Sequence, residues 1–450
     1  MGRLFGTDGV RGVANQELTP ELAFRLGRAT AHVLLANRKQ TEEAGRILIG
    51  RDTRVSGEML EAALVAGVTS TGAQAVLFGV IPTPAVAYLT PKLGADAGVM
   101  ISASHNPIAD NGIKIFDANG YKLTDEVEDE IESYLEAPKA EAIARPTGLG
   151  VGRVVRQDGD EAYASFLAGT VGGRFDGISV VLDCAYGATY RIAPQVFTAL
   201  GAKVVTLNNE NDGSRINVQC GATAPQELQE AVVKHQAQLG LAYDGDGDRV
   251  IAVDEKGTVL DGDHIMGICG LQMLADGILP HQAIVVTVYS NLGLLETFRK
   301  AGGEVIVTDN GDRKVLAAML ERGIMLGGEQ SGHIIFLEHN STGDGILTSL
   351  QLMATMLRAG KPLSELREQI KKFPQLLANV HSTRKDEWME NEKIRQVVAR
   401  LEAQLGESGR IFIRASGTEA LIRVMVEGPD EAVLKSMVEE ITAVIKAELA

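Results

Sequence analysis

Arg46-Ile47-Leu48-Ile49-Gly50 is a short apolar run of the kind that forms a buried strand. The segment Ser56–Ser70 has the pattern of a helix, and Ala73-Gln74-Ala75-Val76-Leu77-Phe78 predicts a second strand behind it. A strand, a helix and a returning strand form the repeating unit of α/β proteins. This stretch therefore predicts an α/β domain.

The same unit recurs twice along the chain. Strand, helix and strand are predicted at 178–183, 189–200 and 202–207, and again at 283–288, 292–301 and 303–307. Each helix is followed by a glycine, a residue that commonly ends helices, at Gly72, Gly201 and Gly302. An internal repeat of this kind predicts three related α/β domains with mixed sheets.

Residues 371–450 follow a different pattern. Strands are predicted at 377–382, 410–414 and 421–426, and helices at 392–405 and 430–450. These elements predict a smaller α+β C-terminal domain, preceded by a linker within residues 359–373. The expected domains are therefore 1–153, 154–255, 256–370 and 371–450.

The composition excludes several classes of protein. The chain has 450 residues, of which 45% are hydrophobic and 23% charged, and its formal charge is −16. Nucleic acid and anionic membranes are therefore poor partners. Cys184, Cys220 and Cys269 lack metal-ligand spacing and are expected to be buried thiols. A signal-peptide core and bilayer-spanning runs are both missing from the sequence, so a cytoplasmic location is expected.

The most informative local motif is Tyr243-Asp244-Gly245-Asp246-Gly247-Asp248-Arg249. Three carboxylates alternate with glycine, so the backbone can curl until all three side chains reach one point. A hard divalent cation, Mg²⁺ or Ca²⁺, would offset their mutual repulsion. A solvated acidic turn is the simpler alternative. An EF-hand is rejected, because its sixth position requires glycine where Arg249 stands, and the flanks 239–243 and 250–253 predict strands.

A second motif contains two serines. Ile101-Ser102-Ala103-Ser104-His105-Asn106-Pro107 precedes Asp110-Asn111-Gly112-Ile113-Lys114. Asn-Pro and Asn-Gly are common in turns, so an ordinary turn is one interpretation. In the other interpretation, one serine is a nucleophile or phosphate carrier beside a histidine and a lysine. Spacing alone does not choose between the two serines.

Two further loops combine glycine with polar side chains. Gly327-Gly328-Glu329-Gln330-Ser331-Gly332-His333 could bring polar groups and a histidine to a sugar. Arg414-Ala415-Ser416-Gly417-Thr418-Glu419, followed by Arg423, combines backbone N–H groups, hydroxyls and arginines that suit a phosphate. A hairpin with exposed charges is the alternative for this loop. The sequence contains no Walker loop, which argues against an ATP-dependent kinase of that type.

Together these motifs resemble those of the α-D-phosphohexomutases. Ser-His-Asn-Pro, Asp-Gly-Asp-Gly-Asp-Arg, Gly-Glu-Gln-Ser-Gly-His and Arg-Ala-Ser-Gly-Thr-Glu occur in the order of that superfamily. The resemblance extends from Phe5-Gly6-Thr7-Asp8-Gly9-Val10-Arg11-Gly12 to Val426, and it is greatest to the bacterial phosphoglucosamine mutases. Ala420 stands where the family usually has proline, which removes some loop rigidity but no ligand.

The resemblance implies a role for each motif. Ser104 would carry the phosphate, and Ser102 would be structural. One Mg²⁺ ion would be bound by Asp244, Asp246, Asp248 and a phosphoryl oxygen on Ser104. Arg249 would pair with the phosphoryl group, and Glu329 and Ser331 would hold sugar hydroxyls. The non-reacting phosphate would be bound by Arg414, Ser416, Gly417, Thr418 and Arg423. The proton carriers would be Lys114 and His333, with Arg11 and His105 in support.

The implied activity is that of an isomerase. Such an enzyme would interconvert glucosamine 6-phosphate and glucosamine 1-phosphate through an enzyme-bound glucosamine 1,6-bisphosphate, and so feed UDP-N-acetylglucosamine and peptidoglycan precursor synthesis. A phosphomannomutase or phosphoglucomutase is the near alternative. Asp246-x-Asp248-x-Val250 also resembles haloacid-dehalogenase phosphatases, in which an aspartate is the nucleophile. The expected partner is a small phosphosugar; the sequence leaves the oligomeric state open, with a homodimer as the assembly considered.

Overall fold

The computed structural model describes residues 3–36, 44–416 and 420–449. It divides into two compact units, which are described separately. One contains Met1–Tyr289 and Gly302–Gln369, and the other contains Ser290–Ala301 and Ile370–Ala450. Among the described helices, none combines the length and the apolar character needed to cross a membrane.

The first sheet of the larger unit has six strands in the order β1-β5-β4-β2-β3-β6. Its strands are β1 (Val10–Val13), β2 (Arg46–Arg51), β3 (Gln74–Val80), β4 (Ala97–Ile101), β5 (Asp110–Phe116) and β6 (Val154–Arg156). The helices in this part of the chain are α1 (Pro20–Leu35), α2 (Ser56–Thr69), α3 (Thr83–Lys92), α4 (Asp125–Ser133) and α5 (Lys139–Ala142). Strands β3, β2 and β4 are parallel, and β5 runs antiparallel to β4.

The second sheet has the order β11-β10-β9-β7-β8 and the third β13-β12-β14-β15. The second comprises β7 (Ser179–Asp183), β8 (Lys203–Leu207), β9 (Leu239–Tyr243), β10 (Val250–Asp254) and β11 (Val259–Leu260), with helices α6 (Asp160–Gly169), α7 (Ile192–Ala199) and α8 (Gln226–His235). The third comprises β12 (Ala283–Thr287), β13 (Glu304–Thr308), β14 (Leu326–Gly328) and β15 (Ile334–Phe336), with α9 (Gly262–Ala275), α11 (Asp312–Arg322), α12 (Gly345–Ala359) and α13 (Leu363–Arg367).

The three sheets share one arrangement, which confirms the predicted repeat. In each, the first strand of the unit pairs in parallel with the returning strand on one side and with a third strand on the other. That third strand then turns back into an antiparallel partner, which gives the hairpins β4–β5, β9–β10 and β14–β15. The loops of these hairpins therefore occupy equivalent positions in the three repeats.

The backbone conformation explains why a glycine follows each of the three repeat helices. Gly72, Gly201 and Gly302 have φ values of 93°, 94° and 91°. These values lie where side chains with a Cβ atom are disfavoured, so glycine lets the chain leave the helix and re-enter the sheet.

Both faces of the central strands are covered. Every residue of β4, β9, β10 and β12 is buried. This explains their continuous apolar sequences, which lack the alternation of a half-exposed strand. Strands β6 and β11 extend the first and second sheets a few residues past the boundaries expected at 153 and 255.

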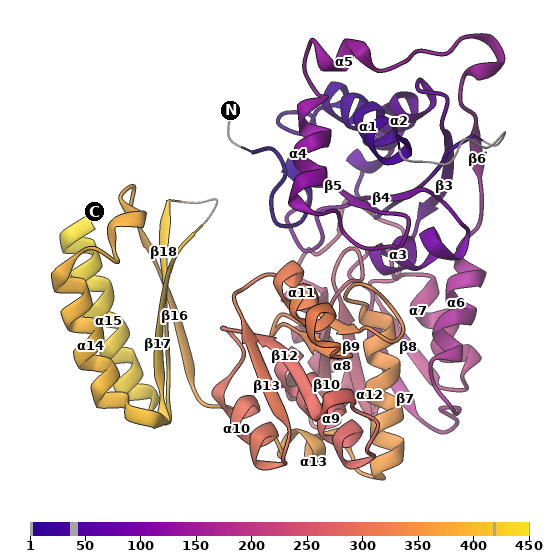
Figure 1. Ribbon diagram of the computed structural model, residues 1–450. Helices are drawn as coiled ribbons and strands as arrows, with labels where there is room; N and C mark the ends of the chain where they lie inside the picture. Colours follow the sequence, from indigo (N-terminus) through magenta and orange to yellow (C-terminus); the bar gives the residue numbers. More distant parts are fainter. Residues whose placement is uncertain (1–2, 37–43, 417–419, 450) are drawn as a thin grey trace. The chain divides into compact units, whose positions relative to one another are not determined.

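The smaller unit contains a three-stranded antiparallel sheet of order β16-β18-β17. Its strands are β16 (Gln375–His381), β17 (Arg410–Ala415) and β18 (Leu421–Glu427). Helices α14 (Glu392–Leu405) and α15 (Glu431–Leu449) lie along one face of this sheet (Figure 1), and α10 (Leu292–Lys300) belongs to the same unit. This confirms the predicted α+β fold of the C-terminal segment.

Candidate functional site

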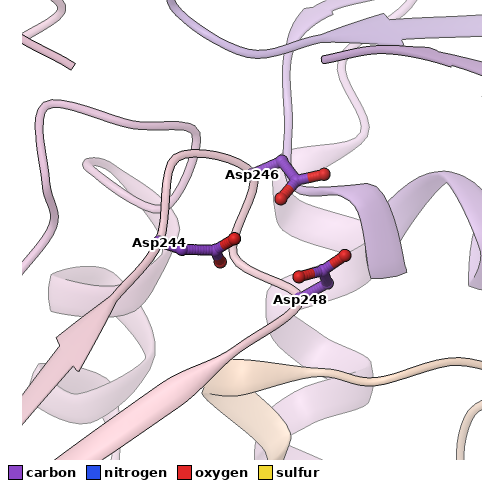
Figure 2. Close-up of side chains that lie close together, drawn as sticks. All are labelled: Asp244, Asp246 and Asp248. Carbon is purple, nitrogen blue, oxygen red and sulfur yellow. The ribbon is translucent and has the colours of Figure 1, made fainter. Parts of the chain in front are cut away.

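The acidic motif forms the loop of the β9–β10 hairpin. The carboxylates of Asp244, Asp246 and Asp248 point toward a common centre (Figure 2), each offering one oxygen atom within 4.8 Å of the others. All three side chains are buried. Gly245 is required here, because a Cβ atom on it would lie 2.6 Å from the carbonyl oxygen of Ser104. The tight loop therefore brings three charges together against the serine loop of the first repeat.

The electrostatics of the triad favour a bound cation. Burial, reinforced by Asp248 and Asp246, raises the pKa of Asp244 well above its ordinary range. Among the described residues, Asp246 Oδ1 and Asp248 Oδ1 have no hydrogen-bond partner although both atoms are buried. Buried carboxylate oxygens without donors are costly unless a cation takes them as ligands. The donor set is made of oxygen only, so the site fits a hard divalent metal ion.

Ser104 lies in the loop of the β4–β5 hairpin and faces the triad. Its Oγ is 2.5 Å from Asp244 Oδ2 and 3.3 Å from His105 Nδ1. The residue is fully buried, and its φ of 52° is unusual for a side chain with a Cβ atom. Ser102 points elsewhere, because its hydroxyl donates to Asp52 Oδ2 at 2.6 Å. Of the two serines, Ser104 is thus the one beside the acidic cluster.

Lys114, on β5, is the buried cation of this cluster. Its Nζ lies 2.8 Å from Asp246 Oδ2, 3.1 Å from Asp248 Oδ2 and 3.2 Å from Asp8 Oδ2. Although burial opposes it, the nearby carboxylates raise the pKa of Lys114. The ammonium group therefore stays protonated and partly neutralises the site.

Three further predicted residues lie in or next to the serine loop. Arg11 forms an ion pair with Asp8 and donates to Asn106 Oδ1 at 3.4 Å. The backbone N–H of Arg249 donates to Asp244 Oδ1 at 3.2 Å, and its Nε lies 3.7 Å from Asp248 Oδ1. Burial and the positive charges of Arg249 and Arg11 lower the pKa of His105 to about 4. His105 is therefore neutral at physiological pH in this environment.

The β14–β15 hairpin brings the third predicted loop to the same region. The carbonyl of Gly332 accepts the N–H of Val250, which directly follows the acidic motif, at 3.1 Å. Glu329 accepts hydrogen bonds from Gly311 N–H and from Ser331 Oγ at 3.2 and 3.3 Å. His333 is buried; its Nε2 accepts from Gly343 N–H at 3.3 Å. Its Nδ1 has no hydrogen-bond partner among the described residues.

The C-terminal candidates lie in the smaller unit. Arg414 on β17 and Arg423 on β18 are direct cross-strand partners, and both are half-buried. Lys385 donates to the carbonyl oxygen of Ser416, so another cation lies at this end of the sheet. Gly417 and Thr418 lie outside the described residues. Two like charges placed opposite each other repel, and an anion bound between them would relieve that repulsion.

The sequence analysis missed several polar residues of the site. Asp8 contacts Arg11, Lys114 and Lys122, although it stands within the N-terminal motif 5–12. Thr83 donates to Asp246 Oδ2 at 2.5 Å from the start of α3. Apart from Arg11, which is three residues from Asp8, their partners come from distant segments, so no local spacing connects them. Asp52 and Arg54 were also missed, although a charged Asp-Thr-Arg directly behind the buried strand β2 was a usable signal.

Four family models match successive parts of the chain. They describe phosphoglucomutase/phosphomannomutase alpha/beta/alpha domain I at residues 2–142, domain II at 162–257, domain III at 261–373 and the C-terminal domain at 377–444. This confirms the resemblance to phosphohexomutases, and it does not favour the haloacid-dehalogenase alternative.

Close relatives carry a more specific name. The chain is 54% identical over 448 residues to the phosphoglucosamine mutase of Carboxydothermus hydrogenoformans, covering 99% of this chain and 100% of that protein. It is 51% identical over 450 residues to the phosphoglucosamine mutase of Brevibacillus brevis, covering 100% of both.

Solved structures share the fold. A phosphoglucomutase/phosphomannomutase family protein of Burkholderia thailandensis superposes with a TM-score of 0.83 at 24% identity, covering 99% of this chain and 97% of that one. The N-acetylphosphoglucosamine mutase of Aspergillus fumigatus, solved with GlcNAc-6P and magnesium, gives 0.71 at 18% identity, with 99% and 96% coverage.

Proposed function

The chain belongs to the phosphoglucomutase/phosphomannomutase family, and on that basis we propose that it is an isomerase that interconverts glucosamine 6-phosphate and glucosamine 1-phosphate. The structural observation that carries the proposal is the hydroxyl of Ser104, which faces the buried carboxylates of the β9–β10 loop. A serine nucleophile beside an acidic metal-type site suits phosphoryl transfer.

The reaction requires two phosphoryl transfers. Phosphorylated Ser104 gives its phosphoryl group to a hydroxyl of the sugar: the bond from Oγ to phosphorus breaks, the bond from the sugar oxygen to phosphorus forms, and the hydroxyl proton passes to a base. The product is glucosamine 1,6-bisphosphate. After the sugar turns, the bond from its other ester oxygen to phosphorus breaks and a bond from Ser104 Oγ to phosphorus forms; the released sugar oxygen takes up a proton and becomes the hydroxyl of the isomer.

Asp244, Asp246 and Asp248, with a phosphoryl oxygen on Ser104, would hold one Mg²⁺ ion. When bound, it withdraws charge from the phosphoryl group during transfer. Arg249 would pair with the same group. Lys114 is buried beside the carboxylates, and the buried Nδ1 atom of His333 lacks a protein partner in the described part of the chain. The Nδ1 atom supports His333 as a proton acceptor, whereas Lys114, which stays protonated, would act as a proton donor, with Arg11 and His105 assisting.

The sugar and its second phosphate would be bound by the remaining loops. Glu329 and Ser331 carry the polar groups that suit sugar hydroxyls. The phosphate-binding set in the smaller unit would consist of Arg414, Ser416, Gly417, Thr418 and Arg423. A binding loop that recognises phosphate rather than the sugar ring can hold either end of the bisphosphate, which the turn of the intermediate requires.

Substrate preference tests the proposal directly. We expect kcat/KM to be highest for glucosamine 6-phosphate when turnover of glucosamine, mannose and glucose phosphates is compared in Mg²⁺ buffer. The sequence identity to phosphoglucosamine mutases is the reason for this order. A higher kcat/KM for mannose or glucose phosphate would instead assign the chain to the near alternative.

Replacing Arg423 with alanine should weaken the hold on the non-reacting phosphate. We expect a lower kcat/KM, equivalent to a loss of roughly 1.5–3 kcal/mol of transition-state binding, which is the usual contribution of a hydrogen bond to a charged group. More bisphosphate should escape per turnover, while Ser104 stays phosphorylated. Steady-state kinetics and measurement of released bisphosphate check this.

The matched control is Arg400→Ala, which removes an arginine paired with Glu440 between α14 and α15 of the same unit. It should leave kcat/KM unchanged. If Arg423→Ala has the same kcat/KM and bisphosphate release as the wild-type enzyme, other residues bind the non-reacting phosphate.

The homodimer stays a prediction. Each chain has a mass of 47.9 kDa, so light scattering of the purified protein separates one chain from two.

A further inference from the structure

The backbone of Ser104 is held in a conformation that it would not adopt alone. Its φ of 52° lies in the left-handed region, which is unfavourable for a residue with a Cβ atom. Such a conformation persists only where the surroundings impose it. Because the conformation directs Oγ toward Asp244, the groups that impose it are candidates for positioning the nucleophile.

Arg54 is the main group that holds this loop. It follows strand β2, and its side chain is completely buried. Its Nε donates to Asp52 Oδ2 at 3.0 Å. Its two terminal nitrogens donate to three backbone carbonyls of the serine loop, those of Ser104 (2.9 Å), Asn106 (2.8 Å) and Pro107 (2.6 Å), and to that of Asp110 at the start of β5 (3.0 Å). All five N–H groups of the guanidinium are therefore used, four of them on the serine loop and the strand that follows it.

Further hydrogen bonds hold the backbone of Ser104. Its N–H donates to Ser102 Oγ at 2.9 Å, and Ser102 in turn donates to Asp52 at 2.6 Å. Its carbonyl oxygen also accepts from Asn217 Nδ2 of the second repeat at 2.9 Å. Both backbone groups of Ser104 are thus connected to the Asp52–Arg54 pair, and the carbonyl is connected to the repeat that carries the acidic triad.

We propose that Arg54 is a positioning residue for the phosphoryl transfer: with Asp52 and Asn217 it holds Ser104 so that Oγ faces the acidic triad. The proposal rests on the proposed mutase function. Lysine cannot replace this arginine, because its single ammonium group has three donors and no planar fork. A shift of the nucleophile by about 1 Å is enough to cost roughly a hundredfold in rate.

Arg54→Lys tests the proposal with the full-length enzyme. We expect kcat to fall about a hundredfold, while KM for glucosamine 6-phosphate stays within about threefold of wild type. Transfer from glucose 1,6-bisphosphate to Ser104, followed by intact mass, should slow to a similar extent. These readouts separate misplacement of the nucleophile from simple loss of folded protein.

Arg28→Lys is the matched control. Arg28 is also a buried arginine of the first repeat, and it donates to Ser70 Oγ and to the carbonyl of Ile143 at 2.8 and 3.0 Å, away from the site. It should lower the Tm without changing kcat per folded molecule. If Arg54→Lys behaves in the same way, the positioning role is wrong.

If Arg54→Lys does not fold, Asn217→Gly provides a second test of the proposal. Asn217 has a φ of 59°, which glycine adopts freely, so this variant removes only the side-chain donor. We expect kcat to fall about tenfold with KM unchanged. A folded Asn217→Gly enzyme with wild-type kcat would overturn the proposal. Absence of mutase activity in the wild-type enzyme would instead refute the proposed function, and with it this inference.

Discussion

Ser104→Ala is expected to reduce mutase activity by at least about a thousandfold, because it removes the hydroxyl that faces Asp244 and is proposed to carry the phosphoryl group. The variant should still fold, since the Ser104 contacts to Ser102, Arg54 and Asn217 use backbone atoms. Kinetics with glucosamine 6-phosphate measure the loss. Intact mass should show that phosphate is no longer incorporated from a hexose 1,6-bisphosphate.

Ser102→Ala is the matched control for this prediction. Ser102 Oγ bonds to Asp52 and to the N–H of Ser104, so its loss should lower the Tm and reduce turnover far less than Ser104→Ala, because the Ser104 hydroxyl remains. Peptide mapping of the phosphorylated wild-type enzyme decides between the two serines. Phosphate found on Ser102 would refute the assignment to Ser104.

Asp246→Asn should produce the second large effect, a loss of metal-dependent rate of about a hundredfold with the fold retained. Asparagine has nearly the same shape, and its oxygen can still accept from Thr83 or Lys114, which both contact Asp246 Oδ2. It cannot supply the negative charge that a hard cation requires. Activity titrated against Mg²⁺ should show a weaker apparent affinity and a lower maximum.

Asp183→Asn supplies the control for charge removal at a buried site. Asp183 ends the neighbouring strand β7 and accepts backbone N–H groups from Ala185 and Gly221, so it acts on local structure. This variant should lower the Tm and leave the Mg²⁺ dependence unchanged. If Asp246→Asn keeps full activity in EDTA, the acidic triad is not the metal site.

Local patterns in the sequence predicted much of the fold. Three apolar runs predicted the strands β2, β7 and β12, and each run is followed by a helix and then by Gly72, Gly201 or Gly302. These patterns identified the repeated α/β unit, because hydrophobic periodicity and helix termination depend on residues that are close in the sequence. The hairpins β4–β5 and β14–β15 were not predicted. The strands β14 and β15 have only three residues each and are too short to show a period.

The sequence by itself also determined the chemistry of the site residues: carboxylates alternating with glycine, a serine before histidine, and arginines around a glycine loop. The tertiary structure of the larger unit decided that the carboxylates and the serine meet. The three loops of the larger unit converge because they close the same hairpin of three repeats, each at the carboxyl end of a parallel strand. Ser104, rather than Ser102, lies beside the acidic triad because of a left-handed backbone and hydrogen bonds from Arg54 and Asn217, which are 50 and 113 residues away. Contacts over such separations depend on how sheets and loops pack, and no local period or motif encodes them.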